Sequence, residues 1–520
     1  MPQDVTLTPR RKWTAMAAIA LGVSLVIMDA TIVNVALPVV IDDLSLNATQ
    51  AQWMNAVYAL VFAALMLTFG RLADLYGRKL LFLLGMGLFG IGSLVAGSAT
   101  GPAMLIGARL VQGIGAAAIL PSTLSTLNAL FFGRERGIAF AIYGSTIGGM
   151  AAVGPLVGGW LATDVSWRWA FWLNLPFLVL AVILTLTAMP ETRDTTIQRG
   201  LDLVGTALAS AGLAGIVFGL IEASEYGWWK QDSGSISPVP IALVGGTLLV
   251  GVFVWWERRR EQRNQVVLTH LGLFGIRSFR YGAIAALIVA LGEFGMLFAL
   301  PLVLQGAMSY SALGTGWLIL SLAAGTFVMS GAVPQITNKI GQTAVVRIGL
   351  GLEAVAILGL AAVLPGKPWQ LALLLFVYGA GVGMATAQLT SVILSQVPVA
   401  RSGEASGLQT TVRQLGSALG VALLGGLLIT SLTTGTEDGL AKTGMPASVQ
   451  SRIVDVVHGS VGAAIPSLEK SPQTAPAAKV ASDALISAAR ATTGVAGGVL
   501  MLGLLATFMI PKVPEPAEAT

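Results

Sequence analysis

Long apolar runs separated by short polar segments make up most of the chain. Each run has about 18 to 25 residues, enough for a helix to cross a hydrocarbon core about 30 Å thick. The runs are continuous, whereas a strand of a membrane barrel alternates apolar and polar residues over about 10 positions. Because backbone groups in lipid must be bonded within the protein, the pattern predicts an all-α membrane protein. We expect fourteen transmembrane helices, at residues 13–37, 51–70, 80–99, 103–129, 138–162, 171–189, 203–222, 239–256, 280–304, 313–334, 347–364, 370–397, 405–430 and 491–511.

Composition and charge agree with a chain that lies mostly in lipid. Hydrophobic residues make up 55% of the sequence and charged residues 11%, against roughly 25% charged in a typical soluble domain. Twenty Lys and Arg residues fall in segments on the side of the N-terminus, whereas the short loops of the other side hold only Arg168, Lys230 and Lys367. This asymmetry predicts a protein of the cell membrane with both termini in the cytoplasm. The net charge of +5 then reflects topology, so we expect no nucleic-acid partner.

Four short segments of the first half recur in the same order in the second half. Each recurs 263 to 268 residues later: Ala36-Leu37-Pro38 as Ala299-Leu300-Pro301, Asp74-Leu75-Tyr76-Gly77 as Asn338-Lys339-Ile340-Gly341, Gly113-Ile114-Gly115 as Gly381-Val382-Gly383, and Gly158-Gly159 as Gly425-Gly426. The repeat predicts two parallel six-helix bundles, a transporter architecture in which the substrate site lies near mid-membrane between the bundles. We therefore expect bundles at residues 1–200 and 266–520, with two inserted helices at 201–265.

The only long polar segment, at residues 431–490, is predicted to be an outer loop of the second bundle. Ile453, Val456, Val457 and Val461 fall on one helical face, so short amphipathic helices are one interpretation. A mobile, solvated loop is the other.

The predicted loop between the second and third spans carries a compact group of glycines and charges: Gly70, Asp74, Gly77, Arg78 and Lys79. Glycine permits a tight reversal between helices, and an acid at a helix end accepts hydrogen bonds from the backbone or from Arg. The spacing resembles motif A of the major facilitator superfamily. That resemblance implies a charge latch between Asp74 and Arg78 that holds an inner gate closed. A turn whose charges only mark topology is the alternative.

Three further segments extend this resemblance over the whole chain, to the fourteen-span drug:proton antiporter branch of the family. They are similar to the first-span motif, motif B and the antiporter motif C: Met28-Asp29-Ala30-Thr31-Ile32-Val33-Asn34-Val35-Ala36-Leu37-Pro38, Arg109-Leu110-Val111-Gln112-Gly113-Ile114-Gly115 and Gly154-Pro155-Leu156-Val157-Gly158-Gly159. The chain departs from the family pattern at Met150, where motif C often has a glycine, and at Asn338, which replaces the acid of motif A in the second half. The resemblance implies a major facilitator fold and drug efflux.

The expected kink and packing of the fifth span follow from four of its residues. Pro155 lacks an N–H and frees a carbonyl one turn earlier, which bends a helix. Gly154, Gly158 and Gly159 let a neighbouring helix approach closely. Such packing resists leakage through an antiporter, although ordinary helix packing would make the same contacts.

Charged residues inside the predicted spans are the candidates for proton coupling. An acid or Arg at mid-span costs about 2.5–3.5 kcal/mol on insertion scales, so each must be paired, neutral or facing water. Asp29 and Arg109 both fall in the first bundle, and the resemblance implies that they approach each other and that Arg109 transfers protons. Asp29 is then either a protonation site or a permanently paired structural acid, and it faces either the cavity or a helix neighbour.

Glu293 stands eight residues before Pro301, much as Asp29 stands nine before Pro38, which makes it the second proton-coupling candidate. Arg413 shares a helical stripe with Gln409, and two interpretations are open: it neutralises an acid, or it closes the packing around one. The substrate-binding candidates are Asp29, Asn34, Glu293, Glu353, Gln409 and Arg413.

These observations predict a secondary active transporter that exports amphipathic, often cationic compounds in exchange for protons by alternating access. Apolar walls tolerate varied shapes, which favours several substrates. One alternative is a proton-coupled exporter dedicated to a single endogenous metabolite, lipid-like molecule or antibiotic. A second is a non-transporting membrane sensor or a membrane-embedded enzyme, which we disfavour because Cys is absent and His270 and His458 fall outside the predicted spans. We expect no cofactor, no metal and a monomer.

Overall fold

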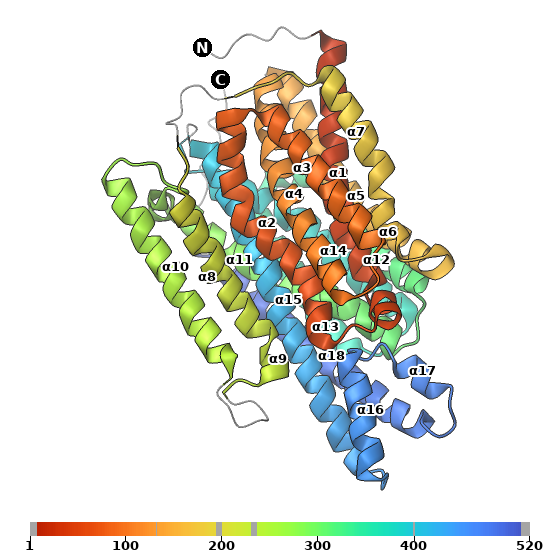
Figure 1. Ribbon diagram of the computed structural model, residues 1–520. Helices are drawn as coiled ribbons and strands as arrows, with labels where there is room; N and C mark the ends of the chain where they lie inside the picture. Colours follow the sequence, from red (N-terminus) through yellow and green to blue (C-terminus); the bar gives the residue numbers. More distant parts are fainter. Residues whose placement is uncertain (1–7, 132, 194–199, 230–236, 399–400, 511–520) are drawn as a thin grey trace.

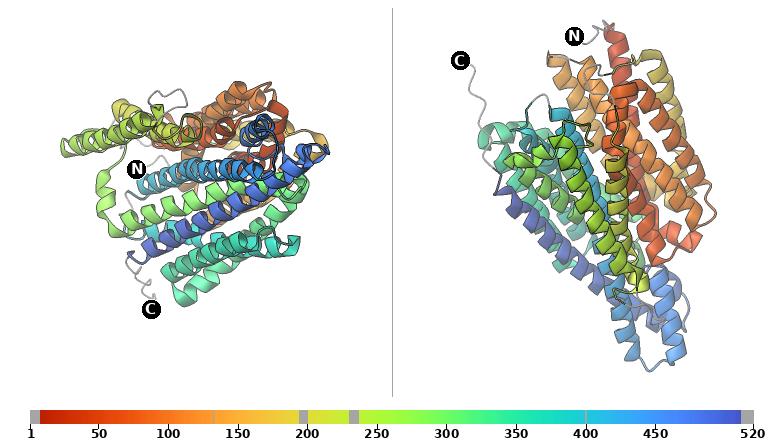
Figure 2. Two further views of the ribbon diagram at one scale, coloured as in Figure 1. Left: turned by 90° about the horizontal axis from the view of Figure 1, so that it is seen from below. Right: turned by 60° about the vertical axis from the view of Figure 1, so that its left-hand side comes forward.

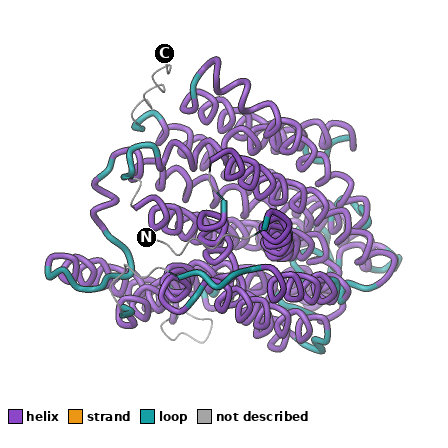
Figure 3. The backbone as a smooth tube through the Cα atoms, turned by 90° about the horizontal axis from the view of Figure 1, so that it is seen from above, coloured by secondary structure: helices purple, strands orange, loops and turns teal. Residues whose placement is uncertain are grey.

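The computed structural model describes residues 8–131, 133–193, 200–229, 237–398 and 401–510, and within these ranges the chain is helical with no strand (Figures 1 and 3). The first long helices are α1 (Pro9–Leu44), α2 (Ala48–Tyr76), α3 (Arg78–Gly97), α4 (Pro102–Leu130), α5 (Gly133–Trp160) and α7 (Asn174–Ala188). Two more follow, α8 (Leu203–Ile221) and α10 (Pro238–Gln262). The second set is α11 (Arg277–Gly306), α12 (Ala312–Ile340), α13 (Gln342–Val363), α14 (Pro368–Leu394), α15 (Ser402–Ala441) and α18 (Ala475–Thr507). Short helices complete the chain: η1 (Leu161–Val165), α6 (Trp169–Trp172), α9 (Ala223–Tyr226), η2 (Leu271–Gly275), α16 (Ala447–Gly459) and α17 (Ile465–Glu469).

The expected membrane spans are present as helices. In the described part of the chain, thirteen helices are long and apolar enough to cross a membrane, with α6 and α7 counted as one span. The remaining expected span, at 138–162, is α5, a helix of 28 residues. The start of α1 and the end of α18 lie at one end of the bundle, which we call the basic end, and α16 and α17 lie at the other end, which we call the far end (Figure 1).

The same helix pairs recur in the two sets of six long helices. In the first set α1 packs on α5 and α7, and α4 packs on α2 and α3. In the second set α11 packs on α15 and α18, and α14 packs on α12 and α13. The packing therefore repeats as the sequence echoes do, although the residue boundaries of the predicted units stay a prediction.

The contacts correct the register of the third sequence echo. Gly113 of α4 packs against the Tyr58 carbonyl of α2, and Gly379 of α14 packs in the same way against Leu322 of α12. Gly113 is therefore equivalent to Gly379, and Gly381 is equivalent to Gly115. The error arose because the run from Gly379 to Gly383 contains the pattern Gly-x-Gly twice.

The fourth echo is shifted by one residue. Gly159 of α5 faces Ala312 of α12, and Gly425 of α15 faces Gln52 of α2, so each of these glycines lies where the two sets of helices meet. Gly159 therefore corresponds to Gly425 and not to Gly426, because a pair of adjacent glycines leaves the register open by one position.

A glycine stands at two tight reversals between long helices at the basic end. Gly77 joins α2 to α3 with φ 127°, and Gly341 joins α12 to α13 with φ 80°. Residues with a Cβ rarely adopt these conformations, so glycine is required at both positions. The expected reversal in the motif A segment lies at Gly77, and its echo has a similar reversal at Gly341.

The inserted helices α8 and α10 form a pair beside the two sets of six. Gly212 of α8 and Gly246 of α10 lie against each other's backbone, which brings the helices close together. α8 also packs on α2 and α15, whereas α10 packs mainly on α8 (Figure 2). α8 thus covers the edge where the two sets meet.

The polar segment 431–490 is largely helical. α15 continues to Ala441, α16 and α17 follow, and α18 begins at Ala475, well before the expected span. Ile453, Val457 and Val461 are buried as the amphipathic pattern predicts, whereas Val456 is 41% exposed, so the prediction is wrong for that residue. Among the long helices of the described chain, α16 packs mainly on α15.

Candidate functional site

Asp29 lies in a fully buried polar cluster that joins helices of the first set. Its carboxylate forms an ion pair with Arg109 of α4, and neither side chain is more than 1% exposed. Asp29 Oδ1 accepts hydrogen bonds from Gln112 Nε2 at 2.9 Å and from Asn174 Nδ2 of α7 at 3.1 Å. Asp29 therefore faces its helix neighbours in this structure, which answers the question of its orientation.

Other residues of the cluster hold the side chains of Gln112, Asn174 and Arg109 in place. Ser93 Oγ of α3 accepts from Gln112 at 2.9 Å and from Asn174 at 3.2 Å. Arg109 Nε donates to the Met54 carbonyl of α2 at 3.2 Å, and its guanidinium lies 4.4 Å from the centroid of the Tyr58 ring. Sequence reasoning assigned no role to the side chains that surround the pair, namely Tyr58, Ser93, Gln112 and Asn174. Each is a polar residue inside an apolar run, which is the signal that could have identified them.

Asn34 does not join this cluster. It is half-buried, and its Nδ2 donates to the Ala30 carbonyl of its own helix at 3.1 Å. On the same side of α1, Thr31 Oγ1 donates to the Met28 carbonyl and packs against Gly154 of α5. The polar face of α1 opposite Asp29 is therefore a helix-packing face around Thr31.

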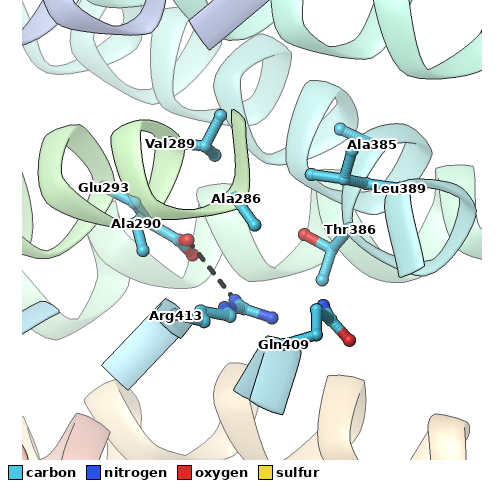
Figure 4. Close-up of a pocket in the computed structure, with 9 residues that line it drawn as sticks. All are labelled: Ala286, Val289, Ala290, Glu293, Ala385, Thr386, Leu389, Gln409 and Arg413. Carbon is cyan, nitrogen blue, oxygen red and sulfur yellow. Dashed lines mark hydrogen bonds and ion pairs between the residues drawn. The ribbon is translucent and has the colours of Figure 1, made fainter. Parts of the chain in front are cut away.

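A second acid–arginine pair lies in the second set of helices, at the wall of a pocket (Figure 4). Arg413 Nη2 of α15 lies 3.4 Å from Glu293 Oε2 of α11, and the two side chains point toward each other across the pocket. Their side chains are 32% and 12% exposed, respectively, so this pair is more accessible than the pair of Asp29 and Arg109. The structure thus brings together two of the predicted site residues at a place where both side chains are partly exposed.

The pocket combines polar and apolar walls. Gln409 and Thr386 add polar groups next to Arg413, and Gln409 Nε2 donates to Thr390 Oγ1 of α14 at 3.0 Å. The apolar lining comes from α11 and α14: Ala286, Val289, Ala290, Ala385 and Leu389. Apolar walls with a small number of placed polar and charged groups are the kind of lining that small-molecule sites use.

Glu353 of α13 lies beside this pair, but it does not line the pocket. It is 1% exposed and interacts electrostatically with Glu293 and Arg413. We expected that it would be a substrate ligand, and its depth argues against direct contact with a substrate in this conformation.

The charged group at the reversal after α2 forms a local network. Arg78 donates to Asp74 Oδ1 through Nη2 at 2.9 Å and through Nε at 3.1 Å, and its Nη1 donates to the Ser125 carbonyl of α4 at 3.2 Å. Glu191 Oε1, at the end of the first set, accepts from the backbone N of Lys79 at 3.1 Å. Glu191 was not singled out in the sequence, because it lies 112 residues away in the chain.

The glycines of the fifth span lie at two different helix contacts. Gly158 packs on Ile32 of α1, within the first set of helices, whereas Gly159 packs on Ala312 of α12, in the second set. Pro155, whose carbonyl lies 2.6 Å from the position that a Cβ on Gly316 would take, is part of the same crossing. The segment from Pro155 to Gly159 of α5 therefore contacts helices of both sets.

Two acids near the far end bind side chains of α2. Glu222 Oε1 accepts from Trp53 Nε1 at 2.9 Å, and Glu225 Oε2 accepts from Thr49 Oγ1 at 3.1 Å. Burial raises the pKa of Glu222, the bond from Trp53 opposes this shift, and the charge of Glu225 adds to it. These acids attach the inserted helices to α2.

Comparison with known proteins gives a consistent match over most of the chain. The sequence profile of the Major Facilitator Superfamily matches residues 19–421. The puromycin resistance protein pur8 of Streptomyces alboniger is 35% identical over 86% of this chain and 87% of its own length. The multidrug efflux pump LfrA of Mycolicibacterium smegmatis is 30% identical over 81% and 82%, respectively. Among solved structures, a bacterial homologue of the human lysosomal transporter Spinster, in an inward-facing conformation, superposes with a TM-score of 0.63 at 17% identity, over 97% of this chain and 98% of that chain.

Proposed function

The chain belongs to the major facilitator superfamily, and from this premise we propose that it exports amphipathic, often cationic compounds in exchange for protons by alternating access. Family membership makes it a transporter rather than an enzyme, and its relatives handle drugs and antibiotics. The proposal includes a monomer in the cell membrane, with both termini in the cytoplasm, driven by the proton gradient without a bound cofactor.

The observation that carries the proposal is the pair of Glu293 and Arg413 at the pocket wall. Their 3.4 Å separation and partial exposure leave the carboxylate within reach of another cation. A cationic substrate that approaches Glu293 competes with Arg413, and a proton competes with both for the same oxygens. Binding of one species therefore disfavours the other, which is the basis of exchange.

Asp29 and Arg109 have a different role from Glu293 and Arg413. Their pair is enclosed by Gln112, Ser93 and Asn174, so a substrate does not reach it without a rearrangement of the first set of helices. We propose that this pair changes protonation when the helices move, and that it does not bind the substrate directly. We also propose that Asp74 and Arg78 form the latch of the gate at the basic end, where they bond to each other and Arg78 bonds to the Ser125 carbonyl of α4.

A drug-sensitivity panel in a host that lacks its own efflux pumps tests the substrate class. The proposal predicts that expression protects against several unrelated lipophilic cations, and that Glu293→Gln at equal membrane abundance loses at least about tenfold of this protection. Protection against one compound only would favour the second candidate function, a dedicated exporter of one antibiotic-like molecule. The similarity to a puromycin resistance protein supports this second candidate. No protection against any compound would contradict both.

A further inference from the structure

The two sets of helices share a glycine crossing between their third and fourth members. In the first set, a Cβ on Gly115 of α4 would lie 2.6 Å from the backbone N of Phe89 in α3 and 2.7 Å from the carbonyl oxygen four residues earlier. In the second set, a Cβ on Gly381 of α14 would lie 2.8 Å from the backbone N of Glu353 in α13 and 2.6 Å from the carbonyl oxygen four residues earlier. Glu353 therefore occupies the position that Phe89 occupies in the first set.

Packing at this crossing does not require an acid. Phe89 is completely buried, as an apolar core residue at this position should be. Glu353 is 1% exposed, and neither of its carboxyl oxygens has a hydrogen-bond partner. An ionised carboxylate without partners is far more costly to bury than a neutral carboxylic acid. The site is therefore suited to the protonated form, and an acid retained at an apolar position points to a use other than packing.

The groups around Glu353 link it to the pocket. It interacts electrostatically with Glu293 of α11 and Arg413 of α15, and Tyr378 of α14, whose hydroxyl has no hydrogen-bond partner, interacts with all three. α12 and α18 also pack on α13, and in the described part of the chain they add no titratable side chain to this group. One arginine thus faces two acids, and it can compensate the charge of only one at a time.

We propose that Glu353 carries the exchanged proton in the second set of helices, whereas Glu293 meets the cationic substrate. This inference rests on the proposed function and assigns its two steps to two residues. When a cation binds Glu293, it displaces Arg413, and the freed guanidinium stabilises the carboxylate of Glu353. The O–H bond of Glu353 then breaks, its electron pair stays on the carboxylate, and the proton passes to water. Loss of the cation reverses these steps.

The test uses purified protein in proteoliposomes, with ethidium as the cation and a trapped pH indicator. Glu353→Gln keeps the shape of the neutral acid, and Glu353→Leu restores an apolar residue like that of the first set. We expect both variants to fold and to catalyse ethidium–ethidium counterflow within about twofold of the wild type. We also expect ethidium accumulation driven by a pH gradient, and the proton flux that accompanies it, to fall at least about tenfold. Glu293→Gln is the matched control, because it should lose counterflow as well.

Two outcomes would overturn the assignment. If Glu353→Gln accumulates ethidium with the wild-type number of protons, Glu353 does not carry the proton. If Glu353→Gln and Glu353→Leu both lose counterflow, the acid serves binding or folding instead. Either result leaves the proposed function standing, provided that the wild type couples the two fluxes. A wild type without coupled fluxes would contradict the proposed function itself.

Discussion

At the scale of single residues, the two acid–arginine pairs differ in how completely they are enclosed. Asp29 and Arg109 have neutral hydrogen-bond partners at three other positions, Met54, Gln112 and Asn174, whereas Glu293 and Arg413 face a pocket. A charge that is enclosed and paired costs little while its partner is present and much when the partner is removed. The first pair is therefore part of the structural core of its helices, and the second is available for exchange.

This contrast leads to a prediction for the first pair. Asp29→Asn and Arg109→Gln should each lower the free energy of unfolding by about 3–5 kcal/mol, because each leaves a buried charge without its counterion. The double variant should lose less than the sum of the two, because it leaves no charge. Thermal unfolding of the purified protein in detergent measures the three effects, and additive losses would contradict the pairing.

The sequence predicted the charged residues of both pairs but not their neutral partners. A charge in an apolar run is conspicuous, and the resemblance to the family implied that Asp29 and Arg109 approach each other. Ser93, Gln112 and Asn174 lie on three different helices, and which faces of these helices meet depends on the packing of nearly uniform apolar surfaces. The lack of a hydrogen-bond partner at Glu353 is likewise visible only when the surrounding atoms are in place.

At the scale of helices and their junctions, the reversal after α2 depends on one glycine. Gly77 has φ 127°, and a Cβ on it would also overlap the Glu191 side chain. Gly70 belongs to the same sequence motif, but it lies within α2, and a Cβ there would be 3.4 Å from Pro121, an ordinary contact. The two glycines therefore have different roles.

Substitution by alanine separates these roles. Gly77→Ala should lower the free energy of unfolding by about 1–3 kcal/mol, the usual cost of a disfavoured backbone conformation, and should reduce export. Gly70→Ala should have little effect on either quantity, since alanine favours a helix. Equal melting temperatures and export rates for the two variants would show that the backbone of Gly77 is not special.

Helix number was predictable because the length of an apolar run sets whether it spans a membrane. Helix ends were less predictable, because α15 and α18 continue beyond their apolar runs, where hydropathy no longer marks a helix. Sequence echoes gave the right order of equivalent helices, but the runs of glycines around Gly381 and Gly425 left their register open until the helix contacts were known.

At the scale of the whole molecule, the two sets of helices meet through a limited number of pairs. α5 packs on α12 and α2 packs on α15, which are equivalent contacts in the repeat. At the far end, Thr163 Oγ1 accepts from the backbone N of Leu313 at 2.9 Å, and Gln305 Nε2 donates to the Val35 carbonyl at 3.0 Å. Each acid–arginine pair lies within one set of helices. When the sets move against each other, each pair therefore travels with its own set.

We propose that a cation bound at Glu293 and Arg413 is exchanged for a proton. The most direct measurement records proton movement across proteoliposomes when ethidium is added on one side, without any imposed gradient. The wild type should move protons in the direction opposite to ethidium, and Glu293→Gln should abolish this flux. Ethidium transport without proton movement, or a proton flux that Glu293→Gln leaves unchanged, would contradict the account.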